Sequence, residues 1–477
     1  MSDLYPRLHR ALNPRVVAVV GDKKATGYNW LKNMQPFTGK LYSVQIDPNE
    51  IPGIEAMGVP NYQSLMDIPD EIDYVICAVP RQVTPRVMRD AVAKRVGGVG
   101  MYTSGFAETG EELGKQLQEA VVGIAREHDM LLIGPNCMGL YNPELGVRFS
   151  AEQMAGVHGN VGAISQSGTH GTNISVLAAA NGIYLTRCVS IGNAVVIDVP
   201  DYIEYFGRNP ETEVIAMYME GARDGRRFAS VLRDVARRKP VVIWKGGQTE
   251  AGARATMSHT ASLAAPANVW NALIRQSGAI AVDSLDELVD TLQVLQFNKP
   301  WTGVRLALMA MTGGQSVVLT DAFAKQGFDA PELEESSYEQ LGSFFNIIGG
   351  SYRNPFDMAG TINQDPEYLD RLFQIVDADP NVDAIAMEMS PLWIRRWVNN
   401  PAMFDDLLDR IKRHQERSAM PFVAILHPAH LEAEVASLRP KIQERGIAVL
   451  PSFDRAARAM ARVVAYHRRR AEESTAG

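Results

Sequence analysis

The sequence predicts an α/β protein built from three consecutive domains, each with a doubly wound and mostly parallel β-sheet. Its 477 residues are enough for about three domains of ordinary size. Short apolar runs that end in Gly, Pro, Ser or Asn alternate along the chain with longer segments of helical period. Because the strands of a parallel sheet are buried on both faces, such runs favour parallel strands joined by crossover helices.

Composition and charge are those of a globular protein and exclude several functional classes. Lys+Arg is 47 and Asp+Glu is 55, which gives a formal net charge of −8. With no basic block, nucleic acid is not an expected partner. No run of apolar residues is long enough for a membrane span, and the first residues do not form a secretory signal, so we expect a cytoplasmic protein. The 3 cysteines are too few and too widely spaced for a disulfide framework.

The first domain is expected to span residues 1–148. Its apolar runs lie at residues 16–21, 40–48, 74–80, 98–105 and 131–136. In an open α/β sheet, ligands bind beyond the carboxyl ends of the strands, where helix N-termini present free N–H groups. The turns that follow these predicted strands are therefore the first places to search for a site.

A second cycle of strands and helices is expected at 149–299, and a third at 300–477. The apolar runs of the second cycle lie at residues 160–168, 186–192, 213–221, 239–247 and 279–284. Those of the third cycle lie at residues 304–314, 383–391, 421–428 and 446–453. A segment with Pro and Gly at 297–303 separates the two cycles, which places a domain boundary there.

The turn after the first predicted strand contains Gly21 and Gly27 with Lys23 and Lys24 between them. Glycine permits close approach of the backbone, and the two ammonium groups suit phosphate oxygens. The dinucleotide motif G-x-G-x-x-G is absent, although Asp47, after the second strand, can imitate its ribose acceptor. From these residues alone, a nucleotide-like ligand and a purely structural turn remain equal alternatives.

Two later turns each join a predicted strand to a predicted helix and offer groups that bind anions. The candidate phosphate-binding residues are Ser165, Ser167, Gly168 and Thr169 in ISQSGTHG, and Gly313 and Gly314 in MTGGQS. Free N–H groups at the positive end of a helix, with hydroxyl donors beside them, form a cradle for phosphate. A plain serine helix cap is the alternative for the first turn. That turn is not the nucleophile motif G-x-S-x-G, because residue 165 is Ser.

His259 and Glu220 are the candidate catalytic residues. His259 lies in a stretch of small residues, GGQTEAGARATMSHTASLAAP, and a free imidazole is a good nucleophile near neutral pH. Glu220 ends the predicted strand EVIAMYME, where a carboxylate can accept a ring N–H and fix the tautomer of a histidine. A surface histidine and an exposed strand-end charge are the alternatives.

Cys137 and the pair His427 and His430 are weaker candidates. Cys137 follows a predicted strand, but no basic neighbour is present to activate it, so a small buried residue is favoured over a nucleophile. The motif HPAH is too short to indicate a metal site, and we expect none.

Taken together, these motifs resemble the NDP-forming acyl-CoA synthetases, the superfamily of succinyl-CoA synthetase and ADP-forming acetyl-CoA synthetase. The resemblance covers nearly the whole chain. The matching stretches are AVVG (18–21), DPNEIPG (47–53), CAVP (77–80), TSGFAETGEE (103–112), IGPNCMGL (133–140), ISQSG (164–168), PETEVIAMYMEGARDGRRF (210–228), KPVVIWKGG (239–247), EAGARATMSHTASLA (250–264) and NPFD (354–357).

The resemblance implies a CoA-binding Rossmann domain followed by two flavodoxin-like ligase domains. It implies that His259 becomes phosphorylated, that Glu220 orients it, and that the turns 165–169 and 312–316 hold the phosphohistidine. The implied CoA-binding residues lie at the strand ends of the first domain: Gly21, Lys23, Lys24, Gly27, Pro48, Val79, Pro80, Ser104, Gly105 and Asn136.

The implied activity is that of an acid–thiol ligase. It interconverts a carboxylic acid, CoA and NTP with acyl-CoA, NDP and phosphate through acyl-phosphate and phosphohistidine intermediates. ATP or ADP with Mg²⁺ is expected on an ATP-grasp β subunit, because this chain has no further segment of about 200 residues for such a module. The resemblance thus implies a heterotetramer in which this chain is the α subunit, with neither nucleic acid nor a membrane as partner.

Three positions depart from the family pattern. Ala261 and Ser262 stand where Gly-Ala is usual, His170 stands where an apolar residue is usual, and Asn49-Glu50 replaces a common Lys. The changes at Ala261 and His170 motivate an alternative, a non-catalytic module that binds CoA or acyl-CoA. A nicotinamide-dependent oxidoreductase is a further alternative, but the missing G-x-G-x-x-G and the additional domains argue against it.

Overall fold

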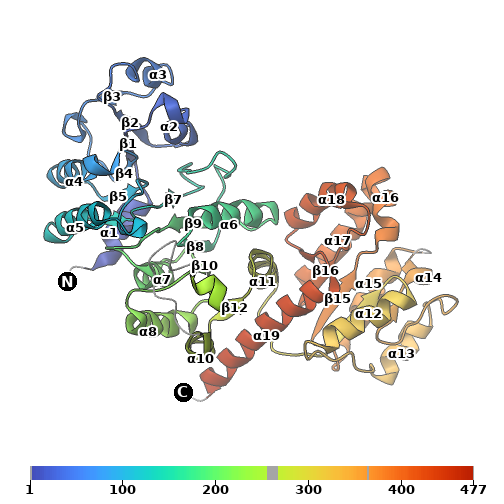
Figure 1. Cartoon of the computed structure of the whole chain (residues 1–477). Coiled ribbons are helices and arrows are strands. Elements are labelled where there is room, and N and C mark those ends of the chain that lie inside the picture. Colours follow the sequence, from blue (N-terminus) through green and yellow to red (C-terminus); the bar gives the residue numbers. More distant parts are fainter. Residues whose placement is uncertain (1–2, 255–266, 363–364, 476–477) are drawn as a thin grey trace. The chain divides into compact units, whose positions relative to one another are not determined.

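The computed structural model describes residues 3–254, 267–362 and 365–475 of the chain, which is drawn in Figure 1. The described residues form three β-sheets, and their strand pairs are parallel except for one at an edge. Contacts among these residues divide the chain into two compact units, Met1–Ala179 with Tyr184–Leu285 and Ala180–Ile183 with Asp286–Gly477. The predicted α/β class with doubly wound sheets is confirmed.

The first sheet, in the first unit, has the strand order β3-β2-β1-β4-β5-β6. Its strands are β1 (Val16–Val20), β2 (Lys40–Val44), β3 (Asn61–Tyr62), β4 (Tyr74–Cys77), β5 (Gly98–Met101) and β6 (Leu132–Ile133). Its helices are α1 (Leu4–Leu12), α2 (Asn29–Asn33), α3 (Ile51–Glu55), α4 (Thr84–Ala93) and α5 (Glu112–Glu127). The apolar β1 lies in register between β2 and β4. The strand order reverses at β1 and β4, which is where open sheets of this kind bind ligands.

The second sheet, also in the first unit, has the strand order β12-β11-β10-β8-β9-β7. Its strands are β7 (Gly139–Tyr141), β8 (Val161–Ser165), β9 (Leu185–Ser190), β10 (Val214–Met219), β11 (Val241–Lys245) and β12 (Ile280–Val282). The connecting helices are α6 (Gly168–Ala180), α7 (Val199–Arg208), α8 (Gly225–Ala236) and α10 (Ala267–Ser277). Strands β8, β10 and β11 are parallel neighbours, so their carboxyl ends meet at one edge of the sheet.

The third sheet lies in the second unit and has the strand order β14-β13-β15-β16-β17. Its strands are β13 (Leu306–Ala310), β14 (Phe356–Asp357), β15 (Ala384–Glu388), β16 (Phe422–Ile425) and β17 (Ala448–Leu450). The helices are α11 (Leu285–Phe297), α12 (Gly313–Ala324), α13 (Glu335–Gly342), α14 (Ala359–Ile362), α15 (Glu367–Ala378), α16 (Pro391–Asn399), α17 (Pro401–Arg417), α18 (Glu432–Glu444) and α19 (Phe453–Thr475). No helix in the described part of the chain has the length and apolarity needed to cross a bilayer.

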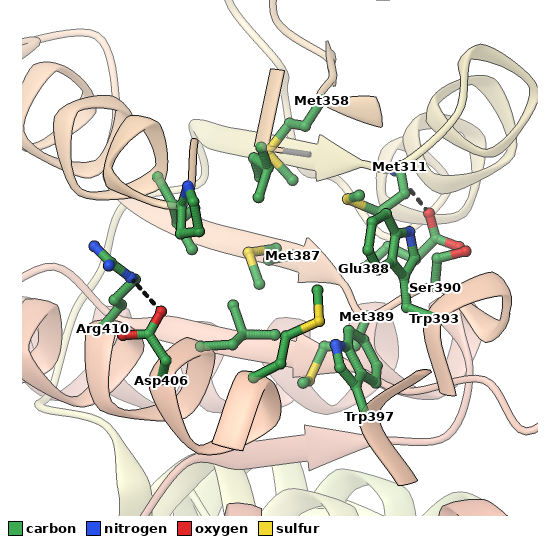
Figure 2. A pocket seen from close by; sticks show the side chains of 15 residues that line it. Met311, Met358, Met387, Glu388, Met389, Ser390, Trp393, Trp397, Asp406 and Arg410 are labelled. Atoms are coloured by element: carbon green, nitrogen blue, oxygen red, sulfur yellow. Dashed lines mark hydrogen bonds and ion pairs between the residues drawn. The ribbon is translucent and has the colours of Figure 1, made fainter. Parts of the chain in front are cut away.

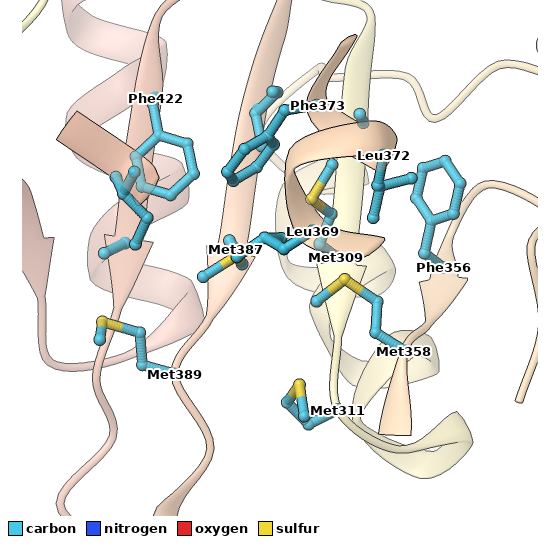
Figure 3. Packing of buried hydrophobic residues seen from close by; sticks show 14 of the residues in the cluster. Met309, Met311, Phe356, Met358, Leu369, Leu372, Phe373, Met387, Met389 and Phe422 are labelled. Carbon is cyan, nitrogen blue, oxygen red and sulfur yellow. The ribbon is translucent and has the colours of Figure 1, made fainter. Parts of the chain in front are cut away.

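Side chains of the third sheet alternate between two apolar clusters, as the two-residue period of a strand requires. On β13, Met309 faces one cluster and Leu308 faces the other. Figure 3 shows the first cluster, in which methionine and phenylalanine side chains of the sheet pack with Leu372 of α15. Methionines gather where the strands end: Met311 follows β13, Met358 follows β14, and Met389 follows β15.

The predicted domain boundaries at 148/149 and 299/300 stay predictions. Strand β7 precedes residue 148 in the chain, yet it pairs with β9 in the second sheet. Helix α11 precedes residue 299, yet it belongs to the second compact unit apart from its first residue. A boundary placed at a loop in the sequence does not predict that β7 pairs with the second sheet or that α11 belongs to the second unit. Both depend on partners that lie far away in the chain.

We expect the substitution Leu372→Ala to lower the free energy of unfolding by about 2–5 kcal/mol, because it leaves a cavity in the first cluster of the third sheet. Leu372 is 1% exposed. Denaturant unfolding followed by circular dichroism measures the change. Leu392→Ala on α16 is the matched control, since Leu392 is 74% exposed and its loss is expected to cost less than about 0.5 kcal/mol. Equal losses in both variants contradict the packing described here.

Candidate functional site

The carboxyl ends of β8, β10 and β11 bring together polar groups from three parts of the chain. Ser165 ends β8, Glu220 directly follows β10, and Lys245 ends β11. Helix α6 begins at Gly168 beside them, so the predicted strand-to-helix turn at 164–171 is present. We call this group, with Gln166, Ser167 and His170, the strand-end site.

The turn between β8 and α6 is shaped by its own hydroxyl groups. Ser165 is buried, and its Oγ donates to the carbonyl of Ser167 at 2.6 Å and accepts the Ser167 N–H at 3.2 Å. The Oγ of Ser167 accepts the N–H of His170 at 3.3 Å, as an N-terminal helix cap does. A Cβ on Gly168 would lie 2.6 Å from Cγ of Met138. The hydroxyl of Ser165 therefore serves the turn, while the start of α6 offers N–H groups to a ligand.

Gln166 holds the end of β10 in place and was not predicted from the sequence. Its Oε1 accepts the backbone N–H of Glu220, and that of Gly221 at 2.9 Å. Its Nε2 donates to the carbonyl of Gly221 at 2.8 Å. The side chain of Gln166 thus takes the place of the next backbone hydrogen bonds between β8 and β10. Its partners lie 54 and 55 residues away, which is why spacing alone did not reveal its role.

The carboxylate of Glu220 is buried and only half satisfied. The residue is 5% exposed, and its Oε1 accepts the hydroxyl of Tyr218 at 3.2 Å. Its Oε2 has no hydrogen-bond partner among the described residues. A buried acceptor of this kind is costly unless a further donor completes it. The exposed strand-end charge considered above is thereby excluded.

His259 and Ala261 lie outside the described residues, as does the rest of 255–266. The pairing of an imidazole at 259 with Glu220 therefore stays a prediction.

Lys245 binds the backbone at the end of β10. Like Gln166, it was not singled out from the sequence. Its Nζ donates to the carbonyl of Glu220 at 2.7 Å and to that of Gly246. Burial lowers the pKa of the Lys245 ammonium, and the charge of Glu220 opposes that shift. Because its donors bind main-chain oxygens, Lys245 fixes the backbone at Glu220. The sequence signal was a lysine directly before the glycines of the strand end WKGG.

His170 is enclosed by aromatic rings beside the start of α6. Its ring centroid lies 4.2 Å from that of Tyr218 and 4.5 Å from that of Trp244. Its Nδ1 is buried without a hydrogen-bond partner among the described residues. Burial lowers the pKa of His170, with the charge of Glu220 acting in the opposite sense, so the neutral ring is favoured. Contact with a phosphoryl group and altered acyl specificity both stay open for this residue.

The predicted CoA-binding residues lie at one edge of the first sheet. They follow β1 (Gly21, Lys23, Lys24, Gly27), β2 (Pro48), β4 (Val79, Pro80), β5 (Ser104, Gly105) and β6 (Asn136). Gly21 has φ +89°, and a Cβ there would lie 2.5 Å from Cγ1 of Val79, so glycine is required where these two strand ends meet. Lys23 and Lys24 are exposed at this edge. Parallel pairing thus brings together the residues that the sequence pattern selected.

Asp22, which the sequence did not single out, organises the turn after β1. Its buried carboxylate accepts the N–H of Leu31 at 2.9 Å and that of Lys23 at 3.0 Å. Burial raises the pKa of Asp22, and these backbone donors oppose the shift. Glu50 accepts the N–H of Lys24 at 2.7 Å, which ties the turn to the segment after β2.

Asp47, the predicted imitation of a ribose acceptor, is engaged in a local turn. Its Oδ1 accepts the backbone N–H and the side-chain amide of Asn49, each at 2.9 Å. These bonds give Asp47 a structural role in the turn after β2, and its role as a ribose acceptor stays a prediction.

Asn136 connects this edge of the first sheet with the second sheet inside the same unit. It has φ +56° and follows the cis bond Gly134–Pro135. Its side-chain amide donates to Asn193 at 3.4 Å, and Asn193 in turn donates to Glu108 at 2.7 Å. Residues from both sheets of the unit therefore meet at this position.

In the second unit, the predicted glycines begin helix α12. Gly313 and Gly314 are exposed, and Thr312 caps the helix by accepting the N–H of Gln315 at 3.3 Å. The strand-to-helix turn is thus confirmed, whereas the convergence of this helix start with that of α6 stays a prediction.

Two family models match the chain. The CoA binding domain matches residues 15–143, and the succinyl-CoA ligase like flavodoxin domain matches residues 158–295. These spans contain, respectively, the strands of the first sheet and those of the second sheet except β7, so the CoA-binding and flavodoxin-like domains expected from the sequence are confirmed.

Full-length relatives extend the match to the third sheet. The alpha subunit of acetate–CoA ligase (ADP-forming) II from Pyrococcus furiosus is 36% identical over 378 residues, which cover 78% of this chain and 80% of that protein. The alpha subunit of acetate–CoA ligase (ADP-forming) I from the same organism is 32% identical over 462 residues, or 95% and 96% of the two chains.

A solved structure shares the whole fold. It is the dinucleotide forming acetyl-coenzyme A synthetase 1 of Ca. Korarchaeum cryptofilum in complex with phosphate and ADP. The TM-score is 0.84 at 29% sequence identity, with 100% of this chain and 99% of that chain covered.

We expect the Cys137 thiol to resist alkylation in the folded chain. Burial raises the pKa of Cys137 to about 12, so the reactive thiolate is scarce near pH 8. Iodoacetamide labelling followed by mass spectrometry of the Cys137 peptide, with and without urea, measures this protection. Rapid labelling of the native chain at Cys137 would revive the hypothesis of a nucleophilic cysteine.

Proposed function

The chain belongs to the ADP-forming acetate–CoA ligases, and on that premise we propose that it is the α-type chain of an acid–thiol ligase. It interconverts a carboxylic acid, CoA and ATP with acyl-CoA, ADP and phosphate. The observation that carries this proposal is the match over 95% of the chain to an alpha subunit of that family. The buried, half-satisfied Glu220 beside the start of α6 supplies the chemical reason.

The reaction needs an acyl phosphate, because a carboxylate accepts a thiol only after one of its oxygens has become a leaving group. A phosphoryl carrier is needed to link this intermediate with a separate nucleotide site. In the direction of acyl-CoA breakdown, a phosphate oxygen attacks the thioester carbon and CoA leaves as the thiol. The resulting acyl phosphate transfers its phosphoryl group to the imidazole of His259 and releases the carboxylate. His259 then passes the phosphoryl group to ADP. The same steps in reverse form acyl-CoA.

In this proposal, Glu220 orients the carrier and the start of α6 binds the phosphoryl group. The unpartnered Oε2 of Glu220 accepts one ring N–H of His259, which leaves the other ring nitrogen for phosphorus. Backbone N–H groups at Gly168 and Thr169 stabilise the negative charge of the phosphohistidine. Gln166 and Lys245 keep the strand end in position for this contact. Gly313 and Gly314 are assigned the corresponding role at α12.

CoA is assigned to the edge of the first sheet. The match to the CoA binding domain and the exposed ammonium groups of Lys23 and Lys24 beside Gly21 support this assignment. Ammonium groups pair with phosphate oxygens, and a glycine backbone permits their close approach. The remaining predicted CoA residues, from Pro48 to Asn136, lie along the same edge.

The partner we propose is an ATP-grasp β chain that binds ATP or ADP with Mg²⁺, in a heterotetramer of the cytoplasm. The name "subunit alpha" of the relatives supports a second kind of chain. A non-catalytic CoA-binding module is less well supported, because these relatives are ligases and Glu220 keeps the arrangement that the chemistry needs.

We expect incubation of the full chain with an acyl-CoA thioester and radiolabelled phosphate to place acid-labile, base-stable phosphate on His259. Acetyl-CoA, isobutyryl-CoA and 3-phenylpropanoyl-CoA serve as the panel of thioesters. His259→Ala is expected to abolish the label, since it removes the acceptor nitrogen. His158→Ala is the control, because His158 is exposed and pairs with Glu144. Label that persists in His259→Ala, or none from any thioester in the unmodified chain, contradicts the assignment.

We expect Glu220→Gln to slow phosphorylation of His259 by about 100-fold, because an amide cannot stabilise positive charge on the ring as a carboxylate does. The rate of label incorporation under single-turnover conditions measures the effect. Glu213→Gln is the control, because Glu213 lies on the surface with Asn160 as its partner. An unchanged rate in Glu220→Gln, with an unchanged melting curve, removes Glu220 from the mechanism.

A further inference from the structure

The carboxyl end of the third sheet holds a pocket that the roles assigned so far do not use. It contains about 640 Å³ free of protein atoms, the solvent at its open mouth included. Seven of the 15 residues that line it are methionines or tryptophans (Figure 2). The methionines are Met311, Met358, Met387, Met389 and Met403, and the tryptophans are Trp393 and Trp397.

Glu388 brings a carboxyl group to this apolar pocket. It ends β15 and is 1% exposed. Its Oε2 accepts the backbone N–H of Met311 at 3.0 Å. Its Oε1 has no hydrogen-bond partner in the described part of the chain. A buried polar atom left in this state calls for an unseen partner, and Glu388 lines the pocket where a ligand can provide one.

Two charged side chains and one serine hydroxyl in the pocket wall have hydrogen-bond or ion-pair partners of their own. Arg410 of α17 pairs with Asp406 at 2.8 Å and also with Asp370 of α15 (the first pair is seen in Figure 2). Ser390 accepts the N–H of Leu392 at 3.4 Å and so caps α16. These pairs leave the Oε1 of Glu388 as a polar atom still available to a ligand.

The surroundings of Glu388 favour its neutral form. Burial raises the pKa of Glu388, the charge of Asp357 on β14 raises it further, and the N–H of Met311 opposes the shift. The charges of α15 and α17 nearby are the paired Asp370, Asp406 and Arg410. A neutral carboxyl group can donate its O–H to a carboxylate, so that two carboxyl groups share one proton.

We propose that this pocket binds the carboxylic acid substrate, with an apolar aromatic or branched body among the methionine and tryptophan side chains and its carboxylate hydrogen-bonded to Glu388. The identity of the ligand as a substrate rests on the proposed function. Methionine side chains adapt to irregular apolar shapes, and the faces of Trp393 and Trp397 suit an aromatic ring. Acetate has too little apolar surface to fill such a pocket, so the preferred acid is larger than acetate.

Direct titration of the full chain with 3-phenylpropanoate tests the inference. Fluorescence of Trp393 and Trp397 and calorimetry report the binding. We expect saturable binding of this acid and none of acetate at the same concentrations. We also expect the affinity to fall by up to about tenfold per pH unit once the pH rises past the raised pKa of Glu388, because an ionised Glu388 has no proton to donate to the carboxylate of the ligand.

Variants separate the pocket from its surroundings. Met403 lies at the rim of the pocket and is 39% exposed, so Met403→Trp is expected to obstruct the mouth and weaken binding at least about tenfold. Glu388→Ala is expected to weaken binding to a similar degree. Glu388→Gln keeps a donor that needs no proton, so binding persists and its pH dependence disappears. Glu335→Gln on α13 is the control, and melting curves verify that each variant is folded.

Each result bears on the inference. Unchanged affinity in both Met403→Trp and Glu388→Ala overturns it, as does equal binding of acetate or preferred binding of 3-phenylpropylamine. His259→Ala is expected to bind 3-phenylpropanoate normally. Label on His259 from acetyl-CoA without binding of 3-phenylpropanoate would refute the pocket alone. Binding without label from any thioester would refute the ligase reaction while leaving a binding pocket for acids.

Discussion

The burial of a glutamate at the carboxyl end of a central strand is the constraint on which the proposed sites of both units depend. Glu220 follows β10 in the second sheet, and Glu388 ends β15 in the third. Each is nearly inaccessible to solvent, and each keeps one carboxyl oxygen without a partner among the described residues. Such an arrangement costs stability. A fold retains it where a ligand or a moving side chain supplies the missing donor.

Each glutamate is held by a hydrogen bond between a side chain and a backbone N–H, with the glutamate as the donor residue in one sheet and as the acceptor residue in the other. In the second sheet, the side chain of Gln166 accepts the backbone N–H of Glu220. In the third sheet, the side chain of Glu388 accepts the backbone N–H of Met311. Both hydrogen bonds join the end of one strand to the strand-to-helix turn that follows the adjacent strand. What differs is the wall around the free oxygen, with Tyr218 beside Glu220 and methionines beside Glu388. The same topological position thus carries the proposed phosphoryl chemistry in one sheet and the proposed apolar recognition in the other.

The sequence predicted the longer strands and the starts of α6 and α12 because their signals are local, but it did not predict the short strands β3, β7 and β14. Apolar runs that end in glycine or serine specified β1, β8 and β13, and the glycines at 168 and 313 marked the beginnings of α6 and α12. The partners of Gln166 and the walls of the apolar pocket could not be predicted in this way. Met311, Met358 and Met389 come together only because β13 lies between β14 and β15. That order is a property of the whole sheet, and no spacing along the chain contains it.

The surroundings of His170 bear on the proposal that His259, and not this second histidine, carries the phosphoryl group. A carrier must present a basic nitrogen first to one phosphorus atom and then to another at a separate site. The ring of His170 packs against Tyr218 and Trp244, and its Nδ1 is buried. Its lowered pKa keeps the ring neutral, but the aromatic contacts hold it in one place. In the sequence, Ser258 and Thr260 flank His259, and neighbours of this size favour close approach to an imidazole. These contacts fit the proposal that transfer belongs to residue 259, with His170 as part of the wall of the strand-end site.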